Sequence, residues 1–180
     1  MRLFFALWPD ANTRERLADA AHAVRLGPET RLVAQENYHL TLVFIGEVAD
    51  SQRALLQAIG RSHGVRRCRI EFDAYEYWRE PKVLVAAARN SPAALVDQGK
   101  RLRSDLAANR LGELALQAPA PLRPHVTLAR KVAQAPVLQA MTPFSWTPLH
   151  LSLVRSDTGG LQSVYTVVDT WPLLDEAPDS

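Results

Sequence analysis

Two short segments of the sequence repeat a histidine and a threonine at the same spacing. The first pairs His39 with Thr41, the second pairs His125 with Thr127, and in each an aliphatic residue separates the two and a leucine follows. Side chains two residues apart in a strand point to the same face of a sheet. Each segment, if extended, would therefore present an imidazole beside a hydroxyl and bury its aliphatic residues on the opposite face.

This combination of groups suits an in-line displacement at phosphorus. One group has to take a proton from the nucleophile, and another has to give a proton to the departing oxygen. Histidine has an unperturbed pKa of about 6.5, so near neutral pH one imidazole can be neutral while its partner is protonated. Threonine hydroxyls can donate to the non-bridging oxygens. We expect His39 and His125 to form the acid/base pair, Thr41 and Thr127 to assist them, and no metal or other cofactor to be needed.

Signals for other chemistries are missing from the sequence. Neither motif has an aspartate or glutamate at close strand or helix spacing, and no His-Glu-x-x-His or paired-cysteine pattern is present. The one cysteine, Cys68, excludes an internal disulfide. Gly159 and Gly160 lack the lysine of a phosphate-binding loop. These observations disfavour a metal hydrolase and nucleoside-triphosphate chemistry.

The surrounding residues predict alternating strands and helices that would hold the two motifs. Helical spacing of apolar residues indicates helices, and runs of apolar and β-branched residues indicate strands. The expected helices are 11–24, 50–62 and 91–109, and the expected strands are 1–8, 29–34, 38–45, 67–77, 82–88, 125–130, 143–147, 149–156 and 161–170. The proline-rich stretch 118–124 should be irregular, and the tail beyond Pro172 should fray.

The composition is that of an ordinary globular protein. The 180 residues are 47% hydrophobic and 22% charged, and the formal net charge of +2 permits a nucleic-acid partner without implying one. The apolar run after Met1 covers about six residues, too few for a signal-peptide core or a membrane span. We expect one compact unit in the reducing cytoplasm.

The two motifs and their flanks resemble the 2H phosphoesterases, and within them the bacterial and archaeal RNA 2',3'-cyclic phosphodiesterases, also described as 2'-5' RNA ligases. The residues that carry the resemblance are 2–7, 37–46 and 123–130. A single His-x-Thr would be weak evidence. Two copies, each with the flanking residues and spacing of the family, are strong evidence together.

The resemblance implies a fold and an activity. The fold would be α+β, with residues 1–180 forming one domain of two pseudo-symmetric lobes, each an antiparallel sheet with outer helices, and a groove between them. The activity would be hydrolysis of a 2',3'-cyclic phosphate, on RNA ends or cyclic nucleotides, to a 2'-phosphate. His125 would accept a proton from water and His39 would donate one to the 3' oxygen. The same pair would also support 2'-5' ligation.

Four further residues are candidates for substrate binding: Arg130, Arg123, Phe5 and Tyr165. Arg130 recurs in the family, but strict alternation from His125 places it on the opposite face, so that only a bulge or the end of the strand would bring it into the groove. The aromatic residues are candidates for stacking on a base. His22, His63 and His150 have no partner motif, and we expect them to be structural or solvent-facing.

Two alternatives to an RNA cyclic phosphodiesterase remain. One is the same chemistry on another substrate, such as 2'-5' oligoadenylate or a small cyclic phosphate. The other is a non-catalytic protein that binds RNA ends, which the intact His-Thr pairs disfavour because binding alone needs positive charge and stacking. A monomer is expected, since one chain carries both histidines.

Overall fold

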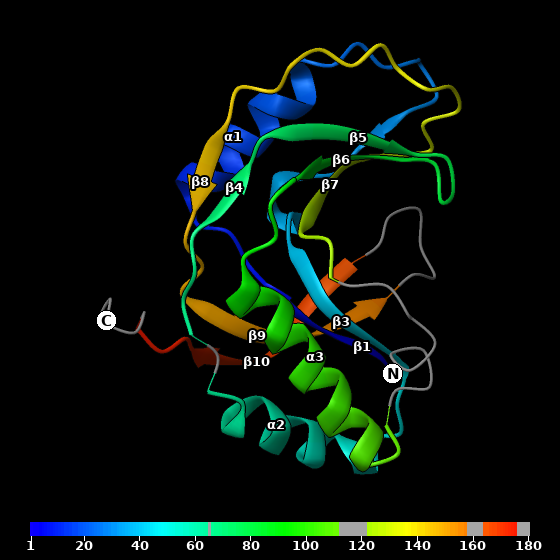
Figure 1. The fold of residues 1–180 in the computed structure, drawn as a ribbon. Coiled ribbons are helices and arrows are strands. Elements are labelled where there is room, and N and C mark those ends of the chain that lie inside the picture. The colour runs from blue at the N-terminus through cyan, green and yellow to red at the C-terminus, as the bar shows by residue number, and fades with distance from the viewer. Residues whose placement is uncertain (65, 112–121, 158–163, 176–180) are drawn as a thin grey trace.

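Two four-stranded antiparallel sheets form the centre of the computed structural model (Figure 1), which describes residues 1–64, 66–111, 122–157 and 164–175. Sheet A has the strand order β10-β9-β1-β3, and sheet B has the order β2-β7-β6-β5. A two-stranded sheet pairs β4 with β8. The strands are β1 (Arg2–Leu7), β2 (Arg31–Leu32), β3 (Leu40–Glu47), β4 (Ile70–Phe72), β5 (Ala74–Trp78), β6 (Val83–Ala87), β7 (His125–Arg130), β8 (Phe144–Trp146), β9 (His150–Asp157) and β10 (Val164–Pro172).

The chain alternates between the two sheets. It passes from β1 in sheet A to β2 in sheet B and back to β3 in sheet A, then builds β5, β6 and β7 of sheet B, and finally β9 and β10 of sheet A. The two motifs lie at the start of β3 and of β7, which belong to different sheets and contact each other. The expected α+β fold of antiparallel sheets and outer helices is confirmed.

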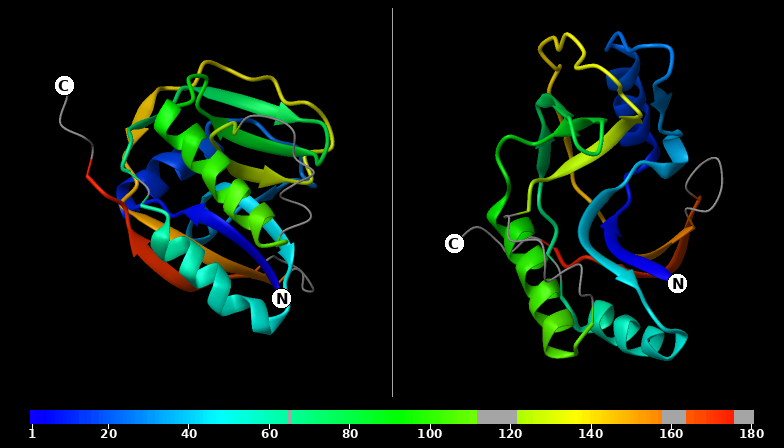
Figure 2. Two further views of the ribbon diagram at one scale, coloured as in Figure 1. Left: turned by 60° about the horizontal axis from the view of Figure 1, so that its bottom comes forward. Right: turned by 90° about the vertical axis from the view of Figure 1, so that its right-hand side faces the viewer.

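Within the ranges given above, three α-helices cover the sheets. Helix α1 (Ala11–His22) packs against β7 and is capped by Asp10, whose side chain accepts a hydrogen bond from the backbone nitrogen of Thr13 at 2.8 Å. Helix α2 (Arg53–Ser62) packs against β9 and β10, and helix α3 (Ala93–Ala108) against β3, so both cover sheet A (Figure 2). Short 3-10 helices span Gln35–Asn37 and Asp50–Gln52. In the described residues no helix is long and apolar enough to cross a membrane.

Strand β1 is buried on both faces. Leu3, Phe5 and Leu7 point into the main core, while Phe4 and Ala6 belong to a separate apolar cluster on the opposite face of sheet A. A strand covered on both faces has no polar side, which explains the unbroken apolar sequence from Leu3 to Leu7.

Strand β3 contains a β-bulge within the first motif. In its pairing with β1, the register advances from Thr41 directly to Val43 and skips Leu42. A bulge places two residues of one strand opposite one residue of the other, which reverses the alternation beyond it. Leu42 and Val43 are therefore both buried, and Phe44 returns to the face that carries Thr41.

Strand β7 contains a bulge at the matching position of the second motif. Its pairing with β6 advances from Thr127 directly to Ala129 and skips Leu128, and both the skipped and the following residue are fully buried. Arg130 therefore lies on the same face as His125 and Thr127. The two motifs share their local geometry as well as their residue types.

Most expected elements are present, with two differences. The expected strand 67–77 is divided at Asp73, whose side chain accepts a hydrogen bond from the backbone nitrogen of Arg89 at 2.9 Å, so that β4 and β5 join different sheets. The prediction of a frayed tail beyond Pro172 is wrong as far as residue 175. Leu173 is 4% exposed, and the backbone nitrogen of Arg67 donates to the carbonyl oxygen of Leu174 at 2.7 Å. Residues 118–121 of the expected irregular stretch lie outside the described residues.

Candidate active site

One pocket of about 310 Å³ lies between the two sheets and brings both motifs together. His39, Thr41, His125 and Thr127 all line it, as the repeated spacing predicted. The remaining lining residues are Arg2, Phe4, Phe44, Arg130, Ser156 and Tyr165. A somewhat larger hollow lies between α1 and residues 139–144, but it contains no histidine.

The two imidazoles are held in the same way. Nδ1 of His39 lies 2.7 Å from the carbonyl oxygen of Asn37, and Nδ1 of His125 lies 2.8 Å from the carbonyl oxygen of Arg123. A carbonyl oxygen can only accept, so in each ring Nδ1 carries a proton and donates it. This arrangement leaves Nε2 of each ring as the nitrogen that can exchange a proton with a ligand.

Aromatic rings surround His39. Trp8 stacks on it at 5.2 Å between ring centroids with an interplanar angle of 14°, Tyr165 meets it edge-on at 4.8 Å, and Phe4 lies at 5.0 Å. These rings remove water from the imidazole and fix its orientation.

Burial among these rings lowers the pKa of His39 to about 4. The hydrogen bond to Asn37 opposes this change, and the positive charges of Arg130 and His125 add to it. In the free protein His39 is therefore neutral at pH 7. A bound anion would favour its protonated form.

His125 has a different electrostatic environment. Its ring packs against Trp78 at 4.4 Å between centroids, and burial lowers its pKa. The hydrogen bond to Arg123 and the negative charge of Glu76 oppose the change, while the charge of Arg123 adds to it. An acidic and a positive side chain thus act on His125, whereas the charged groups that act on His39 are all positive.

Arg130 and Tyr165 lie in the pocket, and Arg130 does so because of the bulge in β7. The Arg130 guanidinium approaches the Tyr165 hydroxyl at 3.5 Å. This places one positive charge on the sheet-B side of the pocket, where it can face a phosphate group.

Phe5 and Arg123, expected as binding residues, lie outside the pocket. Phe5 is fully buried in the main core, where its ring lies 6.3 Å from that of Trp171. Because neighbouring residues of a strand face opposite ways, Phe4 lines the pocket instead. The Arg123 guanidinium is paired with Glu76.

Four residues that line the pocket were not predicted from the sequence: Arg2, Phe4, Phe44 and Ser156. The Arg2 guanidinium lies over the Phe44 ring at 4.8 Å. Phe44 occupies in the first motif the position that Arg130 occupies in the second, five residues after the histidine. Treating the two motifs as copies of one irregular strand would have identified it.

The other three histidines lie outside the pocket, as expected. Nδ1 of His22 contacts the Ala18 carbonyl at 2.7 Å, His63 is buried between Asp105 and Gln98, and His150 is exposed. Over the described ranges, no group of three or more His, Cys, Asp and Glu side chains could hold a metal ion.

Comparisons with known proteins point to one family. The family model described as the 2'-5' RNA ligase superfamily matches residues 9–160. A protein of Thermus thermophilus named RNA 2',3'-cyclic phosphodiesterase is 30% identical over 187 residues, which cover 98% of this chain and 92% of the relative. A protein of the same name from Escherichia coli is 32% identical over 178 residues, covering 96% of both.

Solved structures agree with this assignment of the fold. The apo crystal structure of E. coli LigT superposes with a TM-score of 0.84 at 26% identity and covers 96% of this chain and 97% of its own. A crystal structure of a Thermus thermophilus protein gives a TM-score of 0.84 at 28% identity and covers 98% of this chain and 100% of its own. The complex of LigT with 3'-AMP gives a TM-score of 0.82 at 26% identity and covers 96% of this chain and 98% of its own.

Proposed function

The chain belongs to the 2'-5' RNA ligase superfamily, and from this premise we propose that it opens 2',3'-cyclic phosphates on RNA ends or nucleotides to 2'-phosphates by two-histidine catalysis. The observation that carries the proposal is the pocket itself. Two His-Thr pairs from different sheets line it, each with Nδ1 held by a backbone carbonyl. The two curated relatives of the chain are named RNA 2',3'-cyclic phosphodiesterase.

The proposed reaction is a single in-line displacement. Nε2 of His125 takes a proton from water as the water oxygen bonds to phosphorus. The bond from phosphorus to the 3' oxygen breaks, and Nε2 of His39 gives that oxygen a proton. The 2' oxygen keeps the phosphate. With a 5'-hydroxyl in place of water, the same steps would form a 2'-5' bond.

The division of roles follows the family that the motifs resemble. Glu76 favours gain of a proton by His125, which suits an acceptor, whereas His39 is neutral in the free protein and gains its proton when the anionic substrate binds. The Thr41 and Thr127 hydroxyls would donate to the non-bridging oxygens, and the Arg130 charge would balance the phosphate.

We propose RNA ends as the principal substrate class and a single chain as the active unit. The curated relatives are named for RNA, and the LigT of E. coli has been crystallised with 3'-AMP. Both histidines of the pocket come from one chain, so no second subunit is needed to complete it.

The test is hydrolysis of a nucleoside 2',3'-cyclic phosphate and of an RNA with a cyclic phosphate end, in excess EDTA, with the 2' and 3' products separated. We expect the wild type to form the 2' product, and His39→Ala and His125→Ala to lose turnover. His150→Ala is the matched control, because His150 is exposed and outside the pocket.

Four results would contradict all or part of the proposal. Activity that requires a divalent ion would refute the metal-independent mechanism, and activity that survives either pocket substitution would refute the roles of the histidines. Tight binding of the cyclic end without turnover in the wild type would identify a binding protein. Turnover of 2'-5' oligoadenylate alone would keep the chemistry and change the substrate.

A further inference from the structure

The supports of His39 and His125 are alike except in one respect. Each ring donates from Nδ1 to the carbonyl two residues earlier in the chain, and each packs against a tryptophan. Beside His125, the half-buried carboxylate of Glu76 in β5 contacts both the tryptophan, Trp78, and the residue that supplies the carbonyl, Arg123. Among the groups that shift the pKa of His39, none is acidic.

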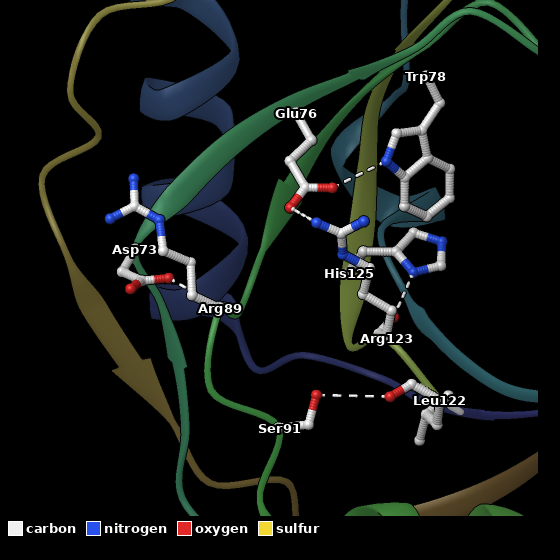
Figure 3. Close-up of polar contacts among 8 residues, drawn as sticks. All are labelled: Asp73, Glu76, Trp78, Arg89, Ser91, Leu122, Arg123 and His125. Atoms are coloured by element: carbon white, nitrogen blue, oxygen red, sulfur yellow. Dashed lines mark hydrogen bonds and ion pairs between the residues drawn. The ribbon is translucent and has the colours of Figure 1, made fainter. Parts of the chain in front are cut away.

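Glu76 makes two polar contacts, and each leads to a residue that touches His125 (Figure 3). Its Oε2 accepts a hydrogen bond from Nε1 of Trp78 at 2.9 Å, and its Oε1 accepts one from the guanidinium of Arg123. The Trp78 ring packs on the His125 ring, and the Arg123 carbonyl accepts from His125 Nδ1. The Glu76 side chain is 17% exposed, so its charge is partly shielded from water.

We propose that Glu76 is a positioning residue for His125: it holds Trp78 and Arg123 where they orient the imidazole, and its charge stabilises the imidazolium that forms when His125 accepts a proton. Glu76 does not line the pocket, so it acts through these neighbours rather than on the substrate. The inference rests on the function proposed above and refines the account of how its proton acceptor is maintained.

The backbone that leads into β7 has other anchors, so a change at Glu76 should act locally. The backbone nitrogen of Ala88 donates to the Pro124 carbonyl at 3.0 Å, and the Ser91 hydroxyl donates to the Leu122 carbonyl at 3.4 Å. Strand β7 also pairs with β6 from His125 onward. Substitution of Glu76 should therefore leave the strand in place and alter mainly the side chains around the imidazole.

Four titratable or charged groups surround His125. Glu76 lies on β5, Arg123 precedes β7, Arg130 lies on β7, and His39 lies across the pocket. Of these groups only Glu76 is acidic. Its removal should lower the pKa of His125 further, because Arg123 would then act on the imidazole without opposition.

The experiment compares three variants. Glu76→Gln keeps an acceptor for the Trp78 indole but removes the charge, and Glu76→Ala removes both. Asp73→Asn is the matched control, because it removes one acidic charge near the same sheet while keeping an acceptor for the Arg89 backbone nitrogen, and it lies away from His125 (Figure 3). Kinetics on a nucleoside 2',3'-cyclic phosphate would be combined with an NMR titration of the histidine rings.

For Glu76→Gln we expect kcat to fall about threefold to tenfold with little change in KM, as for a base weakened by up to about one pKa unit. The NMR pKa of His125 should fall while that of His39 stays, and Glu76→Ala should lose more kcat. Asp73→Asn should match the wild type in both measurements.

An unchanged NMR pKa of His125 and unchanged kcat in Glu76→Gln would overturn the inference. The titration needs no turnover, so it tests the inference separately from the proposed function. If the wild type turns over cyclic phosphate and Glu76→Gln has the same kcat and the same pKa of His125, only the role of Glu76 is refuted.

Discussion

The lowered histidine pKa values predict an unusual pH dependence of kcat/KM. This ratio reports the ionisation of the free enzyme, so the pKa values that matter are those of the pocket before substrate binds. Burial lowers that of His39 to about 4 and lowers that of His125 from its ordinary 6.5. Both groups are therefore mainly neutral above pH 6.5, although the reaction starts with His39 protonated.

The size of the effect follows directly. Above pH 6.5 the fraction of His39 that carries a proton falls tenfold for each pH unit, while His125 is already mainly neutral and changes little. We expect kcat/KM to fall roughly 30-fold between pH 6.5 and 8.0. The fall in kcat should be smaller and begin at higher pH, because the bound phosphate anion raises the pKa of His39.

The assay is steady-state hydrolysis of a nucleoside 2',3'-cyclic phosphate at constant ionic strength over pH 5 to 9, with circular dichroism at each pH to show that the protein stays folded. A kcat/KM that is constant from pH 6.5 to 8.0, or rises, would refute the reasoning. It would mean that His39 is not the donor or that its pKa in the free protein lies above this pH range.

Three other predictions concern the same pocket. The pKa of His39 is lowered in the folded protein, so the unfolded chain binds the proton more readily. The folded state therefore has its full stability above pH 6.5 and loses stability as the pH falls toward 4. Between pH 7 and pH 4, urea unfolding should show that the free energy of unfolding falls by about 3 kcal/mol less for His39→Gln than for the wild type. Thr41→Val and Thr127→Val should each lower kcat about a hundredfold with little effect on KM, which single-turnover kinetics would check; an unchanged kcat would exclude the hydroxyls from catalysis. Arg130→Gln should raise KM about tenfold and raise the pKa of His39 in an NMR titration, because the Arg130 charge lowers that pKa; a lower pKa of His39 in the variant would contradict this.

The placement of the two His-Thr pairs could be predicted from the sequence because it depends on short local patterns. His39 with Thr41, and His125 with Thr127, needed only the alternation of a strand to place imidazole and hydroxyl on one face, and all four line the pocket. The face of Arg130 could not be predicted in this way. It depends on a bulge, and a bulge is defined by the register with a partner strand that is distant in sequence.

The binding residues were less predictable for two physical reasons. Phe4 and Phe5 lie in a strand that is apolar on both faces, so no polar alternation distinguishes the pocket side from the core side. The pairing of Arg123 with Glu76 depends on the order of strands in sheet B, which brings together segments far apart in the chain. Local sequence carries no signal for such a contact.

The alternation of the chain between the two sheets has a consequence for how the protein can be divided. A break between β6 and β7 would put one histidine on each fragment, but it would also remove β9 from its place beside β1 and β7 from its place beside β6. Neither fragment could then complete a sheet, although each carries a full copy of the motif. Turnover from two separately produced fragments would therefore report their reassociation, which makes this break a natural point for a fragment-complementation assay.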